Sequence, residues 1–550
     1  MISPEIYPLC ETAITIEWGN SIDDTIHQQV LHVNSLLCQK PFPGFIETVP
    51  AYTTLTVYYQ PELITAENSS PHLFVKNYIE NLLRDVSVEK IEEEKIISIP
   101  VCYDEEFGYD LDFVTITNNL SKEQVISLHQ QHEYTVYMMG FLPGFAYMGK
   151  VDDAIATPRK PTPRAIVEEG SVGIAGKQTG IYPLPSPGGW QIIGRTPLCL
   201  FDLQKTAPFL FKTGDHVKFY GISKSSFYKT KNEQKLVPSI VQEEDNADAV
   251  IIKPGIFSTI QDTGRYGFQS YGVPISGAMD HTAYCVANAL AGNPKNAATI
   301  ECTMGGLLIQ FKKNAVIAIT GGAAAFINDQ KIKLYQPLSV SKNDLLEIRY
   351  NNDGIRTYVA VRGGFAAAIV MTSKSICPRA GIGNALKKEE GLRFDTFSDP
   401  AAKRVSGNVS IPAYSSHAVI RVIPGAEKDW MRPESIHQFD KQKFTLTNQC
   451  DRMGYHLNGD ALSLSNTTEM LSTAVTKGTI QLTPAGQLIV LMSDCQTSGG
   501  YPRVAQVAAV DLPLVAQLKP GDSIQFTNIS FTEAEDLYLM QQKMINELFS

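Results

Sequence analysis

The chain has 550 residues, of which 43% are hydrophobic and 19% are charged, and its net charge is −10 at pH 7. This composition supports several folded domains, excludes a mostly disordered chain and argues against a nucleic-acid-binding protein. The N-terminus has no basic segment before an apolar run, and no apolar run reaches about 18 residues, so we expect neither a signal peptide nor a membrane span. Nine cysteines without a CxxC pair favour reduced thiols in a cytoplasmic protein.

The first 92 residues predict a small α/β unit. Their apolar patterning indicates two strands and two amphipathic helices, in the order strand 12–18, helix 21–38, strand 54–59 and helix 71–86. Ser21 is the expected N-cap of the first helix.

From residue 93 the sequence changes to short β runs between Gly- and Pro-rich turns, with one helix at 121–131, and we expect a β-barrel over 93–234. The segment 235–249 is polar, acidic and poor in aromatics, which is typical of a linker. The β-rich pattern resumes over 250–550, with helices at 281–292 and at the C-terminus. The expected fold class is therefore α+β and mostly β.

Two segments of the sequence repeat one pattern. PFLFKTGDHVKF (208–219) and PLVAQLKPGDSIQF (513–526) each contain an apolar run, a Gly-Asp turn and a strand, and each follows a Gly- and Pro-rich block at a similar distance. A weaker third copy is YQPLSVSKNDLLEIRY (335–350). Such a hairpin is common on its own, but the matched spacing favours duplicated β-barrel domains.

The densest cluster of Gly, Pro and polar residues lies between 132 and 202. Its segment GSVGIAG (170–176) could cradle an anion with successive backbone N–H groups, including those of Gly173 and Gly176, or could form a barrel corner in which Gly serves geometry alone. The polar side chains expected around this segment are those of His132, Arg159, Arg164, Gln178, Tyr182 and Arg195. His129 and His132 have no third metal ligand nearby in the sequence, so we expect a structural or capping role there and no metal site.

The C-terminal half carries further candidates on three Gly-bearing loops, at 261–280, 450–459 and 491–502. The candidate ligand-binding and catalytic side chains on these loops are Asp262, Arg265, Arg452, Asp494, Gln496 and Thr497. A single Asp-x-Gly-Arg turn is often only a surface ion pair, but three such clusters favour a second concave site at a barrel rim. Its Arg and Gln side chains would bind an amide or a carboxylate, and Asp494 would orient either.

These motifs resemble two protein families. Residues 1–230 are similar to the allophanate hydrolase subunit 1 family, also called the sporulation-kinase inhibitor family and associated with the B subunit of 5-oxoprolinase, through IPVCYDEEFGYDLDFV, GFLPGFAYMG, GSVGIAGKQTGIYP and SPGGWQIIGRTPLCLFD. Residues 249–535 resemble the subunit 2 family, associated with the C subunit of 5-oxoprolinase, through KPGIFSTIQDTGRYGFQSYGVPISGAMD, ANALAGNPKNAATIE, DRMGYHLNG, KGTIQ and DCQTSGGYP. In reversed order, the pair resembles the carboxyltransferase region of urea carboxylase. The resemblance implies cyclophilin-like β-barrels in both halves.

The resemblance further implies a fused B–C component of an ATP-dependent 5-oxoprolinase, which opens the lactam of 5-oxoproline to L-glutamate together with a separate A subunit. ATP with Mg²⁺ is the expected cofactor, and a higher oligomer is possible. We expect no covalent biotin, because the chain lacks a Met-Lys-Met tripeptide. The alternatives are a carboxyltransferase component of a biotin-dependent urea carboxylase-like system and a regulator of a sensor histidine kinase.

For the leading reaction, the 170–176 segment is expected to hold phosphate, Arg195 to clamp charge and His132 to shuttle a proton. Together with Gln178 and Tyr182, these side chains are predicted to converge on one pocket.

Overall fold

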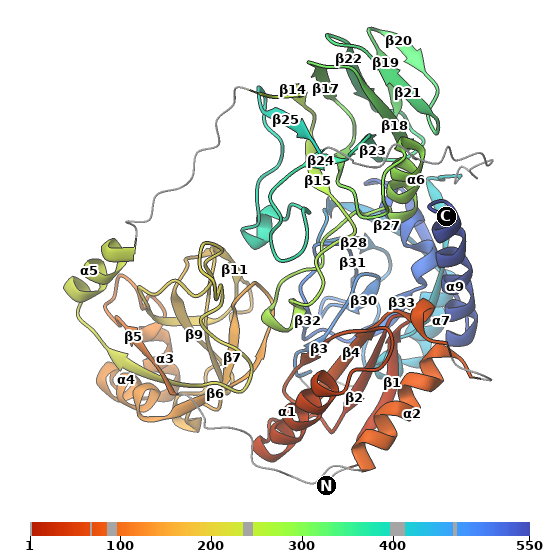
Figure 1. Ribbon diagram of the computed structural model, residues 1–550. Coiled ribbons are helices and arrows are strands. Elements are labelled where there is room, and N and C mark those ends of the chain that lie inside the picture. Colours follow the sequence, from red (N-terminus) through yellow and green to blue (C-terminus); the bar gives the residue numbers. More distant parts are fainter. Residues whose placement is uncertain (1–2, 66–68, 85–95, 235–245, 396–412, 466–469) are drawn as a thin grey trace.

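The computed structural model describes residues 3–65, 69–84, 96–234, 246–395, 413–465 and 470–550. Along the chain it forms a small α/β unit, a first β-barrel, a pair of β-sheets and a second β-barrel, and it ends in a long helix (Figure 1). None of the helices in these ranges is long and apolar enough to cross a membrane. The expected α+β, mostly β fold is confirmed.

The N-terminal unit is a four-stranded sheet in the order β1-β2-β4-β3, with two helices packed on one face. Its elements are β1 (Glu5–Cys10), β2 (Ala13–Glu17), α1 (Asp24–Gln39), β3 (Phe45–Pro50), β4 (Thr54–Tyr59), the short helix η1 (Pro61–Leu63) and α2 (Pro71–Arg84). Both helices bury Val, Leu and Ile side chains against the strands. Asp23 rather than Ser21 caps α1, because its carboxylate accepts a hydrogen bond from the N–H of Ile26 at 3.0 Å.

The first barrel is a seven-stranded sheet in the order β12-β9-β10-β7-β6-β13-β5. An isolated bridge between Cys102, after β5, and Arg195, at the end of β12, joins its outermost strands. Its elements are β5 (Ile96–Val101), α3 (Leu111–Asn118), α4 (Lys122–Gln131), β6 (Glu133–Met139), β7 (Ala146–Gly149), β9 (Ser171–Ala175), β10 (Gln178–Ile181), β12 (Gln191–Arg195), β13 (His216–Gly221) and α5 (Lys224–Gln234). A two-stranded sheet of β8 (Arg164–Val167) and β11 (Ser186–Gly188) lies beside it.

The next part contains a seven-stranded sheet, β20-β19-β22-β17-β14-β25-β24, and a five-stranded sheet, β15-β16-β23-β18-β21. Its strands are β14 (Ala249–Pro254), β15 (Phe257–Gln261), β16 (Thr299–Thr303), β17 (Leu307–Phe311), β18 (Ala315–Gly321), β19 (Ala324–Ile327), β20 (Gln330–Ile332), β21 (Pro337–Val340), β22 (Leu345–Arg349), β23 (Arg356–Val361), β24 (Phe365–Ala366) and β25 (Gly391–Phe394). Helix α6 (His281–Ala291) packs its alanine-rich face against β18 and β23 and is capped by Asp280.

The second barrel is closed, in the order β26-β33-β30-β31-β28-β27-β34. Its elements are β26 (His417–Pro424), α7 (Pro433–Lys441), β27 (Lys443–Cys450), β28 (Gly454–Asn458), β29 (Thr473–Ala474), β30 (Thr479–Leu482), β31 (Leu488–Leu491), β32 (Ser498–Gly499), β33 (Arg503–Val507), α8 (Leu512–Ala516) and β34 (Ser523–Asn528), followed by the C-terminal helix α9 (Phe531–Glu547).

The two barrels share one topology. When β5 is matched with β26 and β13 with β34, every remaining strand of the first barrel has a counterpart with the same neighbours in the second. The pairs β5/β13 and β26/β34 are parallel, and the other pairs are antiparallel in both barrels. The small sheets β8/β11 and β29/β32 also correspond. The predicted duplication is confirmed.

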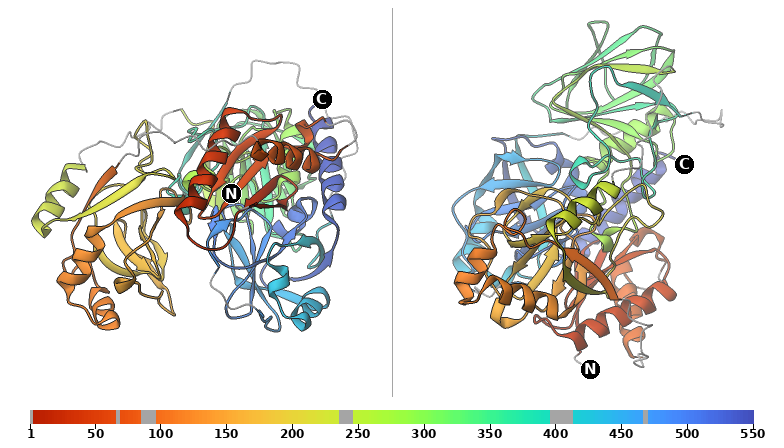
Figure 2. Two further views of the ribbon diagram at one scale, coloured as in Figure 1. Left: turned by 90° about the horizontal axis from the view of Figure 1, so that it is seen from below. Right: turned by 90° about the vertical axis from the view of Figure 1, so that its left-hand side faces the viewer.

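The N-terminal unit packs against the C-terminal half of the chain, although the first barrel follows it in sequence (Figures 1 and 2). Thr54 Oγ1 lies 2.9 Å from Thr473 Oγ1, across 419 residues of sequence. Glu47 on β3 accepts hydrogen bonds from the N–H groups of Gly267 at 2.7 Å and Gln269 at 2.9 Å. These buried polar groups are paired across the interface, as buried polar groups must be to avoid a large desolvation cost.

The expected domain boundaries fall mostly outside the described residues, both at 92/93 and over 235–245 of the expected linker. Ala249, expected as the last linker residue, instead begins β14. The expected module 250–550 is divided between the pair of sheets and the second barrel.

Candidate functional site

A cavity of about 700 Å³ lies between the N-terminal unit and the C-terminal half. This volume falls within the range of small-molecule sites, about 300–1,000 Å³. The N-terminal unit contributes the β1–β2 turn, β3, the end of β4 and η1, and the other walls come from 263–282, 295–296, 475–477, 493–497, 506–513 and α9. Polar side chains on these walls include Glu11, Thr12, Gln60, Glu62, Ser276, His281, Lys295, Lys477, Ser493, Gln496, Thr497 and Gln506.

Lys477 presents a cation on the wall formed by the second barrel. It precedes Gly478, which has φ of +91° and where a Cβ atom would lie 2.6 Å from the Gln506 side chain, so the turn requires glycine. Gln506 Nε2 donates to the Lys477 carbonyl at 2.9 Å, and the ammonium donates to the carbonyls of Met279 at 2.8 Å and Ala278 at 3.2 Å. Burial lowers the pKa of Lys477 to about 8. An ammonium with this pKa can bind an anion or transfer a proton near neutral pH.

Gln496 and Thr497 line the same cavity, and each carries a polar atom that the protein does not satisfy. Gln496 Oε1 and Thr497 Oγ1 are buried without a hydrogen-bond partner in the described part of the chain. Thr497 is only 2% exposed. An unsatisfied buried polar atom costs about 1–3 kcal/mol, so both atoms are suited to a polar ligand in the cavity.

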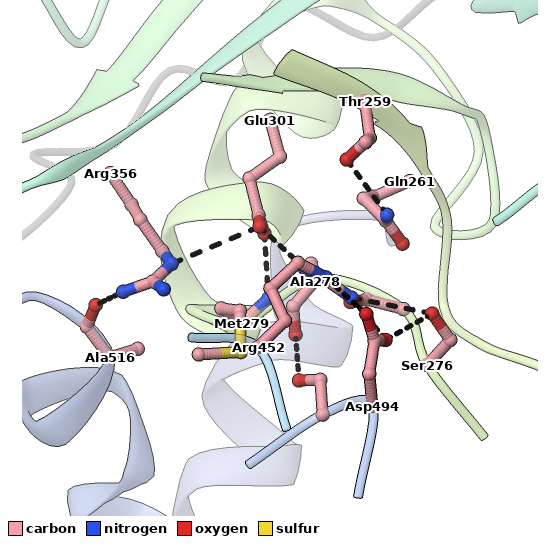
Figure 3. A network of polar contacts seen from close by, with 12 residues as sticks. Thr259, Gln261, Ser276, Ala278, Met279, Glu301, Arg356, Arg452, Asp494 and Ala516 are labelled. Carbon is pink, nitrogen blue, oxygen red and sulfur yellow. Dashed lines mark hydrogen bonds and ion pairs between the residues drawn. The ribbon is translucent and has the colours of Figure 1, made fainter. Parts of the chain in front are cut away.

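A buried network of charged side chains lies behind this wall (Figure 3). Arg452 donates to Asp494 through Nε at 2.8 Å and Nη2 at 2.9 Å, to the carbonyl of Gly277 at 2.7 Å, and through Nη1 to Glu301. Ser276 Oγ donates to the same Asp494 carboxylate at 2.6 Å. The network therefore ties the 276–279 segment, which carries the acceptors of Lys477, to the loop that begins at Asp494.

Glu301 is the central carboxylate of this network and is 1% exposed. Burial alone would raise its pKa, but the charges of Arg452 and Arg356 outweigh burial and hold the pKa below its ordinary value. Each charged side chain of the network already has a partner of opposite charge. Moving one partner of a buried ion pair away is costly, because the other charge is then left buried without compensation. We therefore assign the network to supporting the cavity wall.

Two further titratable groups belong to the wall. Glu11, in the β1–β2 turn, is 1% exposed and accepts a hydrogen bond from the N–H of Ala509 at 2.8 Å. Burial raises the pKa of Glu11 to about 6. His281 begins α6, and burial together with the charges of Lys295 and Lys477 lowers its pKa to about 3, so its ring is neutral at physiological pH.

Comparisons with known proteins identify the two halves of the chain. The carboxyltransferase domain, subdomain C and D, matches residues 4–211, and the carboxyltransferase domain, subdomain A and B, matches residues 271–528. The B subunit of 5-oxoprolinase from Bacillus subtilis is 43% identical over 233 residues, which cover 42% of this chain and 97% of that protein. The C subunit of 5-oxoprolinase from Haemophilus influenzae is 34% identical over 283 residues, which cover 51% of this chain and 91% of that protein. The chain belongs to the family of the B and C subunits of 5-oxoprolinase.

A B-like half is thus followed by a C-like half in one chain, as the motifs indicated. A crystal structure of TTHA0988 is 29% identical, with a TM-score of 0.81, and covers 94% of this chain and all of that one. Urea amidolyase of Lachancea kluyveri is 30% identical over 363 residues, which cover 60% of this chain but only 19% of that much longer protein.

In the B-like barrel, the segment 170–176 is not an anion-binding loop, which corrects the first alternative from the sequence. Its core is strand β9, which pairs with β10 on one side and β12 on the other, so its backbone N–H groups are used in the sheet. A Cβ atom on Gly173 would lie 3.1 Å from Trp190 Cβ, and Gly176, with φ of +57°, forms the hairpin turn. These glycines serve packing and chain geometry.

The predicted convergence of four B-half side chains is also wrong. Gln178 pairs with Ala175 at one end of β9, whereas Tyr182 and Arg195 lie beside Ser171 at the other end, which is about 13 Å away at 3.3 Å per residue. His132 is the C-cap residue of α4, and its Nε2 lies 3.4 Å from Asp152 on the surface. Arg195 Nε donates to the carbonyl of Glu169 at 2.7 Å.

The remaining B-half candidates have protein partners. Arg164 pairs with the carboxylate of Asp110 at 2.6 Å. The Arg159 guanidinium lies 6.0 Å from the centre of the Trp190 ring. His129 is fully buried, which agrees with the structural role expected for it.

Of the C-half candidates, Arg452 and Asp494 lie behind the cavity wall, and Gln496 and Thr497 lie in it. Arg265 is fully buried and donates to the carbonyls of Val370 at 2.9 Å and Ser375 at 2.6 Å. Asp262 accepts hydrogen bonds from Ser373 Oγ at 2.6 Å and from the N–H of Lys374. Arg265 and Asp262 therefore hold the 370–375 loop in place.

Sequence reasoning missed Lys477, Glu11 and His281. The signal for Lys477 was the family motif KGTIQ, in which a lysine stands before a glycine that a tight turn requires. No local pattern indicated Glu11, because its site forms only when the N-terminal unit meets residues near Ala509.

Proposed function

We propose that this chain is the fused B–C component of an ATP-dependent 5-oxoprolinase that works with a separate A subunit. The observation that carries the proposal is the cavity, whose walls come from both halves, with Glu11 on the B-like side and Gln496 and Thr497 on the C-like side. The similarity to nearly whole subunits named B and C supports the same activity. Fusion would keep the two walls together.

The proposed reaction activates a lactam, whose amide carbon is a poor electrophile. The lactam oxygen attacks the γ-phosphorus of ATP, bound with Mg²⁺, and releases ADP, while the N–H proton passes to solvent, to give an imidate phosphate. Water adds across the C=N bond, and the C–N bond then breaks while the nitrogen takes up a proton. The resulting acyl phosphate reacts with a second water to give glutamate and inorganic phosphate. One ATP and two waters are consumed per ring opened.

Glu11 and Gln496 fit defined tasks in this sequence. Glu11 can take the proton of the attacking water, because a carboxyl with a pKa of about 6 is largely ionised at neutral pH yet basic enough for general base catalysis. The unsatisfied Oε1 of Gln496 can accept the lactam N–H. General base catalysis typically contributes about 10²–10⁴-fold in rate.

The test is to mix the full chain with the homologue of the A subunit, 5-oxoproline, ATP and Mg²⁺. We expect glutamate and ADP in equal amounts from the mixture, and no glutamate from either protein alone. Glu11→Gln should lower kcat by at least about 10²-fold, whereas Glu5→Gln, an exposed change in the same unit, should leave kcat unchanged. A mixture that makes no glutamate would contradict the proposal.

A second candidate function is carboxyl transfer from carboxybiotin, which the similarity to urea amidolyase favours. This activity would need a biotin carboxylase and a biotin carrier supplied by other proteins. Bicarbonate- and biotin-dependent carboxylation of urea by such a mixture, together with no turnover of 5-oxoproline, would select it.

A further inference from the structure

Two lysines at one end of the cavity have no carboxylate partner. Among the ion pairs of the described residues, none includes Lys295 or Lys477. Lys295 Nζ instead donates to Asn546 Oδ1 at 3.2 Å and to Gln542 Oε1 at 3.4 Å, and Lys477 donates only to backbone carbonyls. Both lysines line the cavity.

The two cations act on the same point in the wall. After burial, the charges of both lysines contribute to lowering the pKa of His281, whose ring is neutral. His281 and Thr282 begin α6, an eleven-residue helix whose N-terminus carries a partial positive charge. This end of the cavity therefore presents two lysines and a neutral His281, while the Asp280 carboxylate that caps α6 is fully buried and bonded to Ala283, Tyr414 and Gln517.

The Thr497 hydroxyl, on another segment of the same cavity wall, gives an independent sign of a ligand. Its side chain is 2% exposed, lines the cavity and has no hydrogen-bond partner in the described ranges. Lys477 donates to the carbonyls of Ala278 and Met279 in the segment that Arg452 ties to Asp494, and Thr497 follows Asp494 by three residues. A cation and an unsatisfied hydroxyl on a braced wall are the elements of an anion site.

We infer that Lys477, Lys295 and Thr497 form an oxyanion-binding subsite at the α6 end of the cavity. The bound group is either the carboxylate of the acid substrate or a phosphoryl group. The inference deepens the proposed function, on which the identity of the acid rests, but binding can be measured with this chain alone and without turnover.

The test is isothermal titration of the full chain with inorganic phosphate, 5-oxoproline and 2-pyrrolidone, which is the same lactam without its carboxylate. Lys477→Met should raise the Kd of the recognised oxyanion at least tenfold, Thr497→Val should raise it by a smaller factor, and Lys477→Arg should restore part of the affinity. Lys342→Met, at an exposed turn outside the cavity, is the matched control and should bind as the wild type does.

The two sources of the anion give different results. If Lys477→Met loses 5-oxoproline binding but keeps phosphate binding, and the wild type binds 2-pyrrolidone weakly, the bound group is the substrate carboxylate. If Lys477→Met loses phosphate binding but keeps 5-oxoproline binding, the bound group is a phosphoryl group. The inference is overturned if the wild type binds neither anion, or if Lys477→Met and Lys295→Met both bind as tightly as the wild type. If phosphate binding depends on Lys477 but the chain makes no glutamate with the A subunit, the oxyanion subsite is supported and the proposed function is rejected.

Discussion

Asp215 and Asp522 occupy the same position in the two barrels. Each carboxylate accepts a hydrogen bond from the N–H three residues earlier, that of Lys212 at 2.9 Å and that of Lys519 at 3.0 Å. The carbonyl of each Asp also accepts a hydrogen bond from the equivalent strand, β6 in the first barrel and β27 in the second. The Gly-Asp echo in the sequence therefore marks a structural repeat.

The first prediction concerns this turn. Asp522→Ala should lower the free energy of unfolding of the second barrel by about 1–3 kcal/mol, because the Lys519 N–H loses a buried partner. Asp344 makes the same bond to the Ser341 N–H at 2.7 Å in the third copy, but in contact with solvent. Asp344→Ala should therefore cost less than Asp522→Ala, as measured by calorimetric Tm. Equal losses would show that burial does not decide the strength of this turn.

The repeat could be read from the sequence because its cause is local. Gly214 and Gly521 have φ of +93° and +89°, and a short turn fixes residue types at fixed positions. The helices expected over 71–86, 121–131 and 281–292 were likewise indicated by local periodicity, although the first is described only to Arg84.

The site could not be predicted in the same way, because its walls come from segments far apart in sequence. The Glu47 contact spans 220 residues, and the Glu11 contact with Ala509 spans 498. The sequence interpretation of Gly173 was wrong for a similar reason. A glycine that leaves room for Trp190 cannot be distinguished in the sequence from one that presents its N–H to an anion.

The second prediction concerns Glu301, whose pKa lies below its ordinary value. A carboxylate of this kind contributes stability at pH above its unfolded-state pKa of about 4.5 and loses it as pH falls through the lower folded-state pKa. Glu301→Gln should cost about 3–5 kcal/mol at pH 7, because Arg452 loses a buried partner. The variant should also show a weaker fall in Tm below pH 4.5. A pH dependence identical to the wild type would assign the acid sensitivity to other carboxylates.

The third prediction concerns Glu11, whose pKa is shifted in the opposite direction, from 4.5 to about 6. Its stability contribution is present below pH 4.5 and is lost as pH rises through 6, because the buried carboxyl must then ionise. The loss is about 2 kcal/mol at 1.36 kcal/mol per pKa unit. Glu11→Gln should therefore stabilise the docked N-terminal unit at pH 8 but not at pH 4. Amide hydrogen exchange of β1 and β2 at the two pH values measures this, and the same gain at both would reject it.

The last prediction separates two residues that the duplication makes equivalent. Arg195 and Gln506 pair with Ser171 and Thr479 at matching points of the two sheets. Each side chain holds the carbonyl two residues before its partner, that of Glu169 for Arg195 and that of Lys477 for Gln506.

Only the second of these turns places a side chain in the cavity. Gln506→Ala should therefore lower kcat/KM by about 10²-fold, the typical cost of displacing a reacting group by about 1 Å, mainly by displacing Lys477. Arg195→Ala should change stability but leave kcat/KM within about threefold of the wild type. Among the described residues, its side chain bonds to Glu169 and Glu168 of its own barrel, so its loss displaces no side chain that lines the cavity. Steady-state kinetics of the complex with the A subunit, with Tm measured in parallel, compares the two variants. A larger kinetic loss for Arg195→Ala than for Gln506→Ala would move the reaction to the B-like barrel.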